Sequence, residues 1–168
     1  NVGESDYQYH GGNRLGANSL LSTIYGGMVT GPAMATYVDN LDRSAHDLPS
    51  TLFDKAEKAE QKKYDAIGAS DGGENPYTLH QELQQTMNDL VGIIRREQEM
   101  TDALARLEAL KQRARQVGVE GHRQFNPGWH LALDLQSMLM VSECVARAAL
   151  LREESRGGHT REDHPAMS

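Results

Sequence analysis

The chain has 168 residues, a mass of 18.6 kDa and a formal net charge of −7 at pH 7. This acidic balance, with a pI of about 5.5, argues against non-specific binding to nucleic acid, which requires a basic surface. The single cysteine excludes an intramolecular disulfide framework, and no apolar run is long enough to span a bilayer.

The first stretch that could carry chemistry is HGGNRLGANSLL, residues 10–21, which places Arg14 among small residues ahead of a helix pattern. Glycines let a ligand approach the backbone closely, and the free N–H groups at a helix start favour negative or electron-rich groups. A guanidinium adds a planar fork suited to a carboxylate or phosphate. The segment therefore predicts an anion or cofactor site. The alternative is a glycine-rich loop whose arginine only satisfies backbone carbonyls.

Apolar residues at helical spacing begin at Ser19, and Asn18 or Ser19 is expected to cap this first helix. Pro32 removes one helical hydrogen bond, so a kink or short break is expected there. The pattern then continues through residues 33–41.

A second, charged helix is predicted to start at a cap formed by Ser50 or Thr51 and to run to about Ile67. Lysine and glutamate alternate over residues 55–63, which indicates a solvated helix face rather than a binding patch. The glycine-rich turn at 68–74 ends the helix.

Three further helices are predicted after this turn. Two Asn-Pro pairs, at 75–76 and 126–127, fit helix starts with asparagine as the cap and proline at the first position. Residues 91–94 separate the first two of these helices, Gly118 ends the second, and Trp129 is expected to pack at the start of the third. Short connections predict a bundle of three antiparallel helices. The residues expected to face inward share helical spacing: Leu79, Leu83, Met87 and Leu90; Leu104, Leu107, Leu110, Ala114 and Val117; Leu131, Leu135, Met138, Val145 and Ala149.

The remaining polar side chains have structural interpretations. Arg95 and Arg96 are expected to be surface charges at the helix break, and Cys144 a small core residue in an apolar stretch. His159 and His164 flank two acidic residues but match no tight zinc spacing, so no metal site is predicted. The tail that contains them is expected to be polar and irregular.

Two separated motifs, HGGNRLGANSLL and ESRGGHTREDHP (residues 154–165), resemble the flavoprotein subunit of succinate dehydrogenase and fumarate reductase. Between them, ENPYTLHQEL and FNPGWHLALDLQSML are similar to the C-terminal helical region of that family. The resemblance covers essentially the whole chain and implies a mainly α fold. Residues 71–168 would form a C-terminal three-helix bundle, preceded by residues 1–70 as a loop-helix remnant of an α/β FAD-binding domain.

The resemblance also implies roles for individual residues. Arg14 matches the arginine that holds a carboxylate of the dicarboxylate substrate, succinate or fumarate. Ser19 and Leu20 match positions whose backbone contacts the flavin ring, where the helix dipole can stabilise negative charge on the reduced flavin. Glu4 matches a glutamate that contacts FAD. No catalytic residue and no chemical role for the tail motif are assigned.

The dinucleotide fingerprint, flavin-attachment histidine and proton-shuttling arginine of the family belong to an N-terminal region that the sequence lacks. The chain is therefore expected to be a C-terminal fragment of an FAD-dependent oxidoreductase that interconverts succinate and fumarate by hydride transfer, and to be inactive alone. The resemblance further implies an iron–sulfur subunit, a membrane anchor and a location on the cytoplasmic face of the inner membrane. The alternatives are a fragment of L-aspartate oxidase, which has a similar loop, and a non-catalytic helical binding module.

Overall fold

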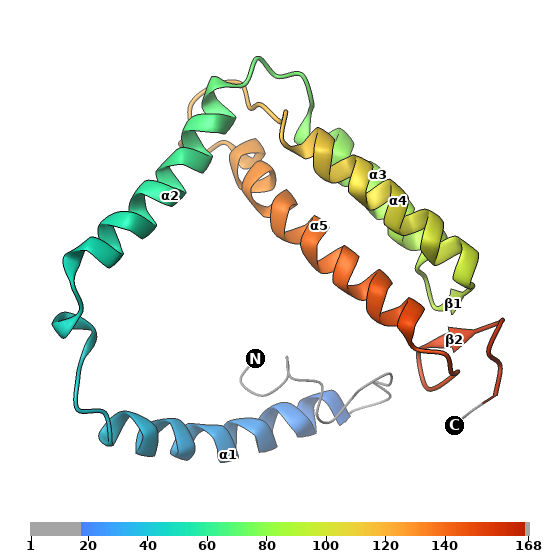
Figure 1. Ribbon diagram of the computed structural model, residues 1–168, viewed down its shortest axis with the longest axis horizontal. Coiled ribbons are helices and arrows are strands. Elements are labelled where there is room, and N and C mark those ends of the chain that lie inside the picture. The colour runs from blue at the N-terminus through green and yellow to red at the C-terminus, as the bar shows by residue number, and fades with distance from the viewer. Residues whose placement is uncertain (1–17, 167–168) are drawn as a thin grey trace.

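The computed structural model describes residues 18–166, and these are mainly α-helical. The helices α3, α4 and α5 lie side by side as a bundle, while α2 leads away from one end of it and α1 turns back below it, so that the two form an open arm (Figure 1). The elements within the described residues are α1 (Asn18–Asp39), the short 3-10 helix η2 (Ala45–Asp47), α2 (Ser50–Ala69), α3 (Pro76–Leu90), β1 (Ile94–Arg95), α4 (Glu97–Ala114), α5 (Pro127–Leu151) and β2 (Thr160–Arg161). None of the helices in this part of the chain is both long and apolar enough to cross a membrane.

The core of the protein lies between α3, α4 and α5, which confirms the predicted three-helix bundle. The inward faces of α3 and α4 follow the predicted spacing, because each of these helices has one apolar stripe and an otherwise polar surface. Full burial of one leucine side chain stabilises the fold by roughly 1.5–3 kcal/mol. The buried residues of this core are Leu79, Leu83, Val91, Ala103, Leu107, Leu110, Ala114, Val117, Ala132, Leu135, Leu139 and Ala146.

The predicted inward face of α5 is partly wrong. Val145 is 38% exposed, and Cys144, expected in the core, is also exposed. Leu139 and Ala146 are buried instead. The sequence of α5 carries apolar residues on more than one face, so hydrophobic periodicity alone does not select the face that packs.

Of the four predicted helix caps, two are confirmed, one is wrong, and the cap of α1 by Asn18 or Ser19 stays a prediction. The side chain of Asn75 accepts hydrogen bonds from N–H groups in the first turn of α3, and that of Asn126 does the same for α5. In contrast, α2 begins at Ser50 directly after Pro49 and has no side-chain cap. It ends at Ala69, two residues beyond the predicted end.

Of the kink or short break predicted near Pro32, the break does not occur, because α1 is one continuous helix through that residue. A proline costs the helix one hydrogen bond, and on an exposed helix water can satisfy the carbonyl that is left free. Helix α4 also ends earlier than the sequence predicts. This helix ends at Ala114, and turns carry the chain on to Gly118.

An aromatic stack joins α2 to the start of α5. Trp129 is buried as predicted and stacks on Tyr64, with 6.1 Å between the ring centroids. The guanidinium of Arg123 lies 5.4 Å from the Tyr64 ring and 5.9 Å from the Trp129 ring, within cation–π range. A Cβ atom at Gly68 would lie 3.5 Å from Trp129, so α2 packs closely here. Trp129 thus packs the C-terminal part of α2 against the start of α5.

The loop after α4 closes against the loop before α3. The N–H of Gly118 donates to the carbonyl of Glu74 at 3.3 Å, and the hydroxyl of Ser70 donates to the carbonyl of Gln116 at 3.0 Å. A Cβ atom at Gly118 would lie only 2.8 Å from backbone atoms of Gly72. Glycine is therefore required at position 118 because two backbones meet there.

We expect Gly118→Ala to lower the free energy of unfolding by about 1–3 kcal/mol, because the added methyl must push two backbone segments apart. Gly73→Ala is the matched control in the same loop, since a Cβ atom there meets its nearest neighbour at an ordinary 3.6 Å. Urea unfolding followed by far-ultraviolet circular dichroism measures both. Equal midpoints for the two variants would show that the loop adapts without cost.

Candidate functional site

The residues expected to contact substrate and flavin fall at the start of the chain. Glu4 and Arg14 lie outside the described residues. Ser19 and Leu20 are adjacent in the first turn of α1, and the Leu20 side chain is 73% exposed. The helix start is therefore where the sequence places it. The first N–H groups of a helix have no partner within the helix, so this end can face an electron-rich group such as a flavin ring.

Helix α1 carries apolar side chains on all sides but remains largely exposed. Its 22 residues contain a single charged side chain, that of Asp39. Helices that are apolar all round are normally buried on all sides in a folded protein or membrane. The described part of the chain leaves the following residues of α1 exposed: Leu20, Leu21, Ile24, Tyr25, Met28, Val29, Met34, Tyr37 and Val38. This surface is suited to burial inside a larger protein.

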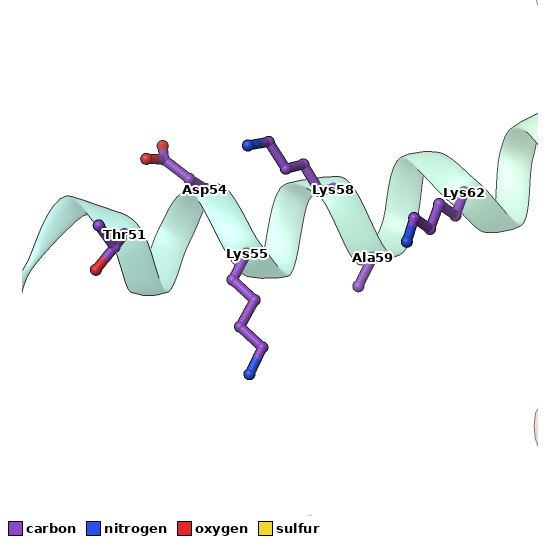
Figure 2. A pocket seen from close by; sticks show the side chains of 6 residues that line it. All are labelled: Thr51, Asp54, Lys55, Lys58, Ala59 and Lys62. Atoms are coloured by element: carbon purple, nitrogen blue, oxygen red, sulfur yellow. The ribbon is translucent and has the colours of Figure 1, made fainter.

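The charged face of α2 offers no convergent site. Figure 2 shows Lys55 and Lys58 leaving opposite sides of the helix, so they do not aim at one anion. Lys63 forms an exposed ion pair with Glu60 at 2.5 Å. These positions agree with a solvated helix face.

The tail motif consists mostly of turns and bends, as expected, but it packs at the far end of the bundle and contains the two-residue strand β2. Strand β2 pairs in parallel with β1, with Ile94 opposite Thr160 and Arg95 opposite Arg161. The N–H of Thr160 donates to the carbonyl of Ile93 at 3.2 Å. We refer to residues 155–166 as the C-terminal strap.

Arg161 is the most deeply placed side chain of the strap, with 1% of its surface exposed. Its guanidinium donates to three carbonyl oxygens at the C-terminal end of α5, at 3.0–3.2 Å. It also donates two hydrogen bonds, of 2.7 and 2.8 Å, to the carboxylate of Asp163. Carbonyls at a helix end lack partners within the helix and favour a cation. Arg161 therefore caps α5.

Asp163 extends this contact to α4. Its carboxylate accepts a hydrogen bond of 2.8 Å from the N–H of Glu97, the first residue of that helix. The Arg161 guanidinium holds the pKa of Asp163 well below its usual range. The Arg161–Asp163 pair thus connects the C-terminal end of α5 with the N-terminal end of α4.

Arg95 and His159 form a second contact between strap and bundle. Arg95 is half-buried, not the surface charge expected, and its Nε donates to the carbonyl of Gly92 at 2.7 Å. Its Nη1 lies 2.6 Å from Nδ1 of His159, and Nε2 of His159 lies 3.0 Å from the carbonyl oxygen of Arg152. Arg96 is exposed, as expected, and pairs with Glu162.

The surroundings of His159 determine its tautomer. An arginine can only donate, so Nδ1 must accept and Nε2 must carry the proton that is donated to Arg152. Burial lowers the pKa of His159, and the nearby cations Arg95, Arg152 and Arg161 lower it further, against the opposing effect of the Arg152 carbonyl. Both ring nitrogens are occupied, and the described residues contain no group of three or more His, Cys, Asp or Glu side chains placed to hold a metal ion.

Sequence reasoning missed this cluster because its partners are far apart in the chain. The Arg95–His159 contact joins residues 64 positions apart. The only local signal was the Arg-x-Asp spacing of Arg161 and Asp163, which is common among solvated residues.

Comparison with known proteins identifies the family. The family described as fumarate reductase flavoprotein C-term matches residues 80–168. The succinate dehydrogenase flavoprotein subunit of Bacillus subtilis is 40% identical over 165 residues, which are 98% of this chain and 28% of that protein.

Two solved structures extend the match to the fold. One chain of the Mycobacterium smegmatis Sdh1 complex in the apo form matches 93% of this chain and 26% of its own length, with a TM-score of 0.83 and 52% identity. A quinol-fumarate reductase with menaquinol molecules matches 90% of this chain and 26% of its own, with a TM-score of 0.78 and 30% identity. The chain spans about 28% of the length of the curated relatives it matches. It belongs to the fumarate reductase flavoprotein C-terminal family.

Proposed function

We propose that this chain acts as the C-terminal part of an FAD-dependent flavoprotein that interconverts succinate and fumarate by hydride transfer. The observation that carries this proposal is the match of 93% of the chain, at 52% identity, to one chain of the Sdh1 complex. Relatives named as succinate dehydrogenase and fumarate reductase flavoprotein subunits support the same activity.

The proposed site is built from the loop before α1 and the first turn of that helix. Arg14 would hold one carboxylate of the substrate, because its two-pronged donor geometry fits a carboxylate. The backbone at Ser19 and Leu20 would face the flavin ring, and Glu4 would accept hydrogen bonds from FAD hydroxyl groups. Bound FAD would supply the hydride chemistry, while these residues bind and orient.

The exposed apolar surface of α1 supports a division of the chain into residues 1–70 and 71–168. Residues 1–70 would complete the FAD-binding domain, where the rest of the flavoprotein covers α1, and residues 71–168 would form the helical domain. The flavin contacts proposed for this chain would not suffice to hold FAD without the rest of the flavoprotein, so the isolated chain would be inactive. The complete enzyme would pair with an iron–sulfur subunit and a membrane anchor on the cytoplasmic face of the inner membrane.

The test is the activity of a purified flavoprotein that carries this sequence at its C-terminal end. We expect it to contain FAD and to oxidise succinate with an artificial electron acceptor. Oxidation of L-aspartate instead of succinate would assign the chain to L-aspartate oxidase. Absence of flavin and of both activities would favour a non-catalytic helical module.

In that flavoprotein we expect Arg14→Lys to lower kcat/KM for succinate by about tenfold or more, with flavin content unchanged. Lysine keeps the charge but loses the planar fork, and a charge-assisted hydrogen bond is worth roughly 1.5–3 kcal/mol, or about 10–150-fold in rate. Arg43→Lys, at an exposed position, is the control. Wild-type kinetics for Arg14→Lys would remove this residue from the substrate site.

A further inference from the structure

The C-terminal strap is folded on itself and is also held to the bundle by hydrogen bonds and ion pairs. Its own loop is closed by two backbone hydrogen bonds between Arg156 and His159, of 2.8 and 3.0 Å. The hydroxyl of Ser155 accepts from the N–H of Arg161 at 2.9 Å and donates to the carbonyl of His164 at 2.8 Å. These bonds remain intact if the strap moves as a unit, so the bonds to the bundle decide whether it stays docked.

The docking contacts differ in how they respond to pH. Arginine stays charged throughout the physiological range, and Arg161 keeps Asp163 ionised far into acid. The backbone bonds from Thr160 to Ile93 and from Glu162 to Arg95 do not titrate. Among the side chains that make the contacts described above, the imidazole of His159 is the group whose ordinary pKa lies between about 5 and 8.

We propose that His159 is a pH-sensitive latch, which strengthens the docking of the C-terminal strap on the bundle while its imidazole is neutral and loosens the strap when the imidazole is protonated. In the neutral state Nδ1 accepts from Arg95 across 2.6 Å and Nε2 donates to the carbonyl of Arg152. Protonation would place an N–H on Nδ1 directly against the N–H of Arg95. Two donors cannot satisfy each other, so the contact must open.

The charges around the latch oppose protonation from three directions. Arg95 faces the ring from β1, Arg152 from the end of α5 and Arg161 from β2. Asp163 on the strap is already engaged by Arg161 and by the N–H at the start of α4. The carboxylate of Glu154 forms an ion pair with Arg152 at 2.5 Å. An imidazolium at position 159 would therefore add a fourth positive charge beside Arg95, Arg152 and the buried Arg161.

The sign of the pH dependence follows from the lowered pKa of His159 in the docked state. Docking contributes its full stability above the ordinary histidine pKa of about 6.5. That contribution is lost as pH falls from there toward the lowered value, because the released strap binds one more proton. Each pH unit in this window is expected to weaken docking about tenfold.

Amide hydrogen exchange by NMR on the whole chain, at about pH 7.5 and about pH 5, tests the latch. After correction for intrinsic exchange rates, protection of the Thr160 and Glu162 amides should fall in acid, by up to about tenfold for each pH unit between the ordinary and the lowered pKa of His159, while Leu107 in α4 keeps its protection. Imidazole nitrogen shifts should show the proton on Nε2 of His159 at the higher pH. A proton on Nδ1, or protection that persists while His159 titrates, would overturn the proposal.

Three variants separate the latch from other acid effects. His164→Gln, in the same strap, should leave the acid release unchanged. His159→Gln should abolish it, since an amide can accept from Arg95 at any pH. Arg95→Gln should also abolish it, because its amide oxygen can accept from a protonated His159. If His159→Gln fails to dock at either pH, the Arg95→Gln result and the wild-type tautomer decide, and acid release that persists in Arg95→Gln contradicts the latch.

Discussion

Arg161→Met is expected to lower the free energy of unfolding by about 3 kcal/mol, at the low end of the range for breaking a buried ion pair. The guanidinium is 1% exposed, but its partner Asp163 is 28% exposed and can be partly solvated after the change. Methionine fills a similar volume but offers no donor to the carbonyls at the end of α5. Urea unfolding of the 168-residue chain, followed by circular dichroism, measures the loss.

Two controls identify the cause of that loss. Arg96→Met removes an exposed arginine that pairs with Glu162 and Glu99, and should leave the urea midpoint unchanged because exposed ion pairs contribute little. Arg161→Lys keeps the charge but not the fork, so its midpoint should lie between those of Arg161→Met and the wild type. Wild-type stability of Arg161→Met would show that the strap does not cap the bundle.

Acid provides an independent check on the same pair. The lowered pKa of Asp163 means that its ion pair contributes in full above the ordinary aspartate pKa of about 3.9 and is lost as pH falls below it. The wild-type chain should therefore lose stability below about pH 4 more steeply than Arg161→Met does. This loss begins below about pH 4, whereas the effect of His159 begins below about pH 6.5, so the onsets of the two effects can be measured separately.

Local sequence signals were sufficient for the start of α3 and for the packed faces of α3 and α4. An asparagine cap followed by proline fixes the start of α3, because the side chain satisfies N–H groups that the helix cannot. One apolar stripe then fixes the face that packs, as the burial of Leu79 and Leu107 shows. In α3 the asparagine cap and the helical spacing of the apolar residues both favour the same helix.

Long-range pairing could not be predicted from local patterns. The bonds of Arg95 to His159 and of Glu97 to Asp163 join residues 64 and 66 positions apart. Strands β1 and β2 have two residues each, too few to show an alternating pattern. The buried Arg161 resembles a solvated arginine in sequence and is recognisable only once its partners are in place.

The candidate site rests on the resemblance more than on residue patterns. Glycine, arginine and a helix start predict an anion site in general terms, whereas the roles of Arg14 and Glu4 come from the family motif. The apolar surface of α1 adds a signal that sequence analysis could have used. A helix that is apolar all round implies a covering protein surface, and exposed residues such as Ile24 and Met28 show that the described chain does not provide it.

The packing of α5 can be tested by substitutions on its buried face and on its exposed faces. Leu139→Ala is expected to lower the free energy of unfolding by about 2–5 kcal/mol, because the Leu139 side chain is 1% exposed and its removal leaves a cavity in the core. Met140→Ala, next in sequence but 63% exposed, should change it by no more than about 0.5 kcal/mol. Val145→Ala, at the position that spacing alone assigned to the core, should cost less than Leu139→Ala.

Urea unfolding of the three variants distinguishes two orientations of α5 about its own axis. Apolar residues lie on more than one face of α5, but the small residues Ala132 and Ala146 are in the core and Glu143 pairs with Lys111 of α4, so these contacts favour the observed orientation. If Val145→Ala proved as costly as Leu139→Ala, the helix would have to be turned toward the orientation expected from spacing. If only Leu139→Ala is costly, the face of α5 that carries Leu139, together with the buried Ala132 and Ala146, is the face that packs on α3 and α4.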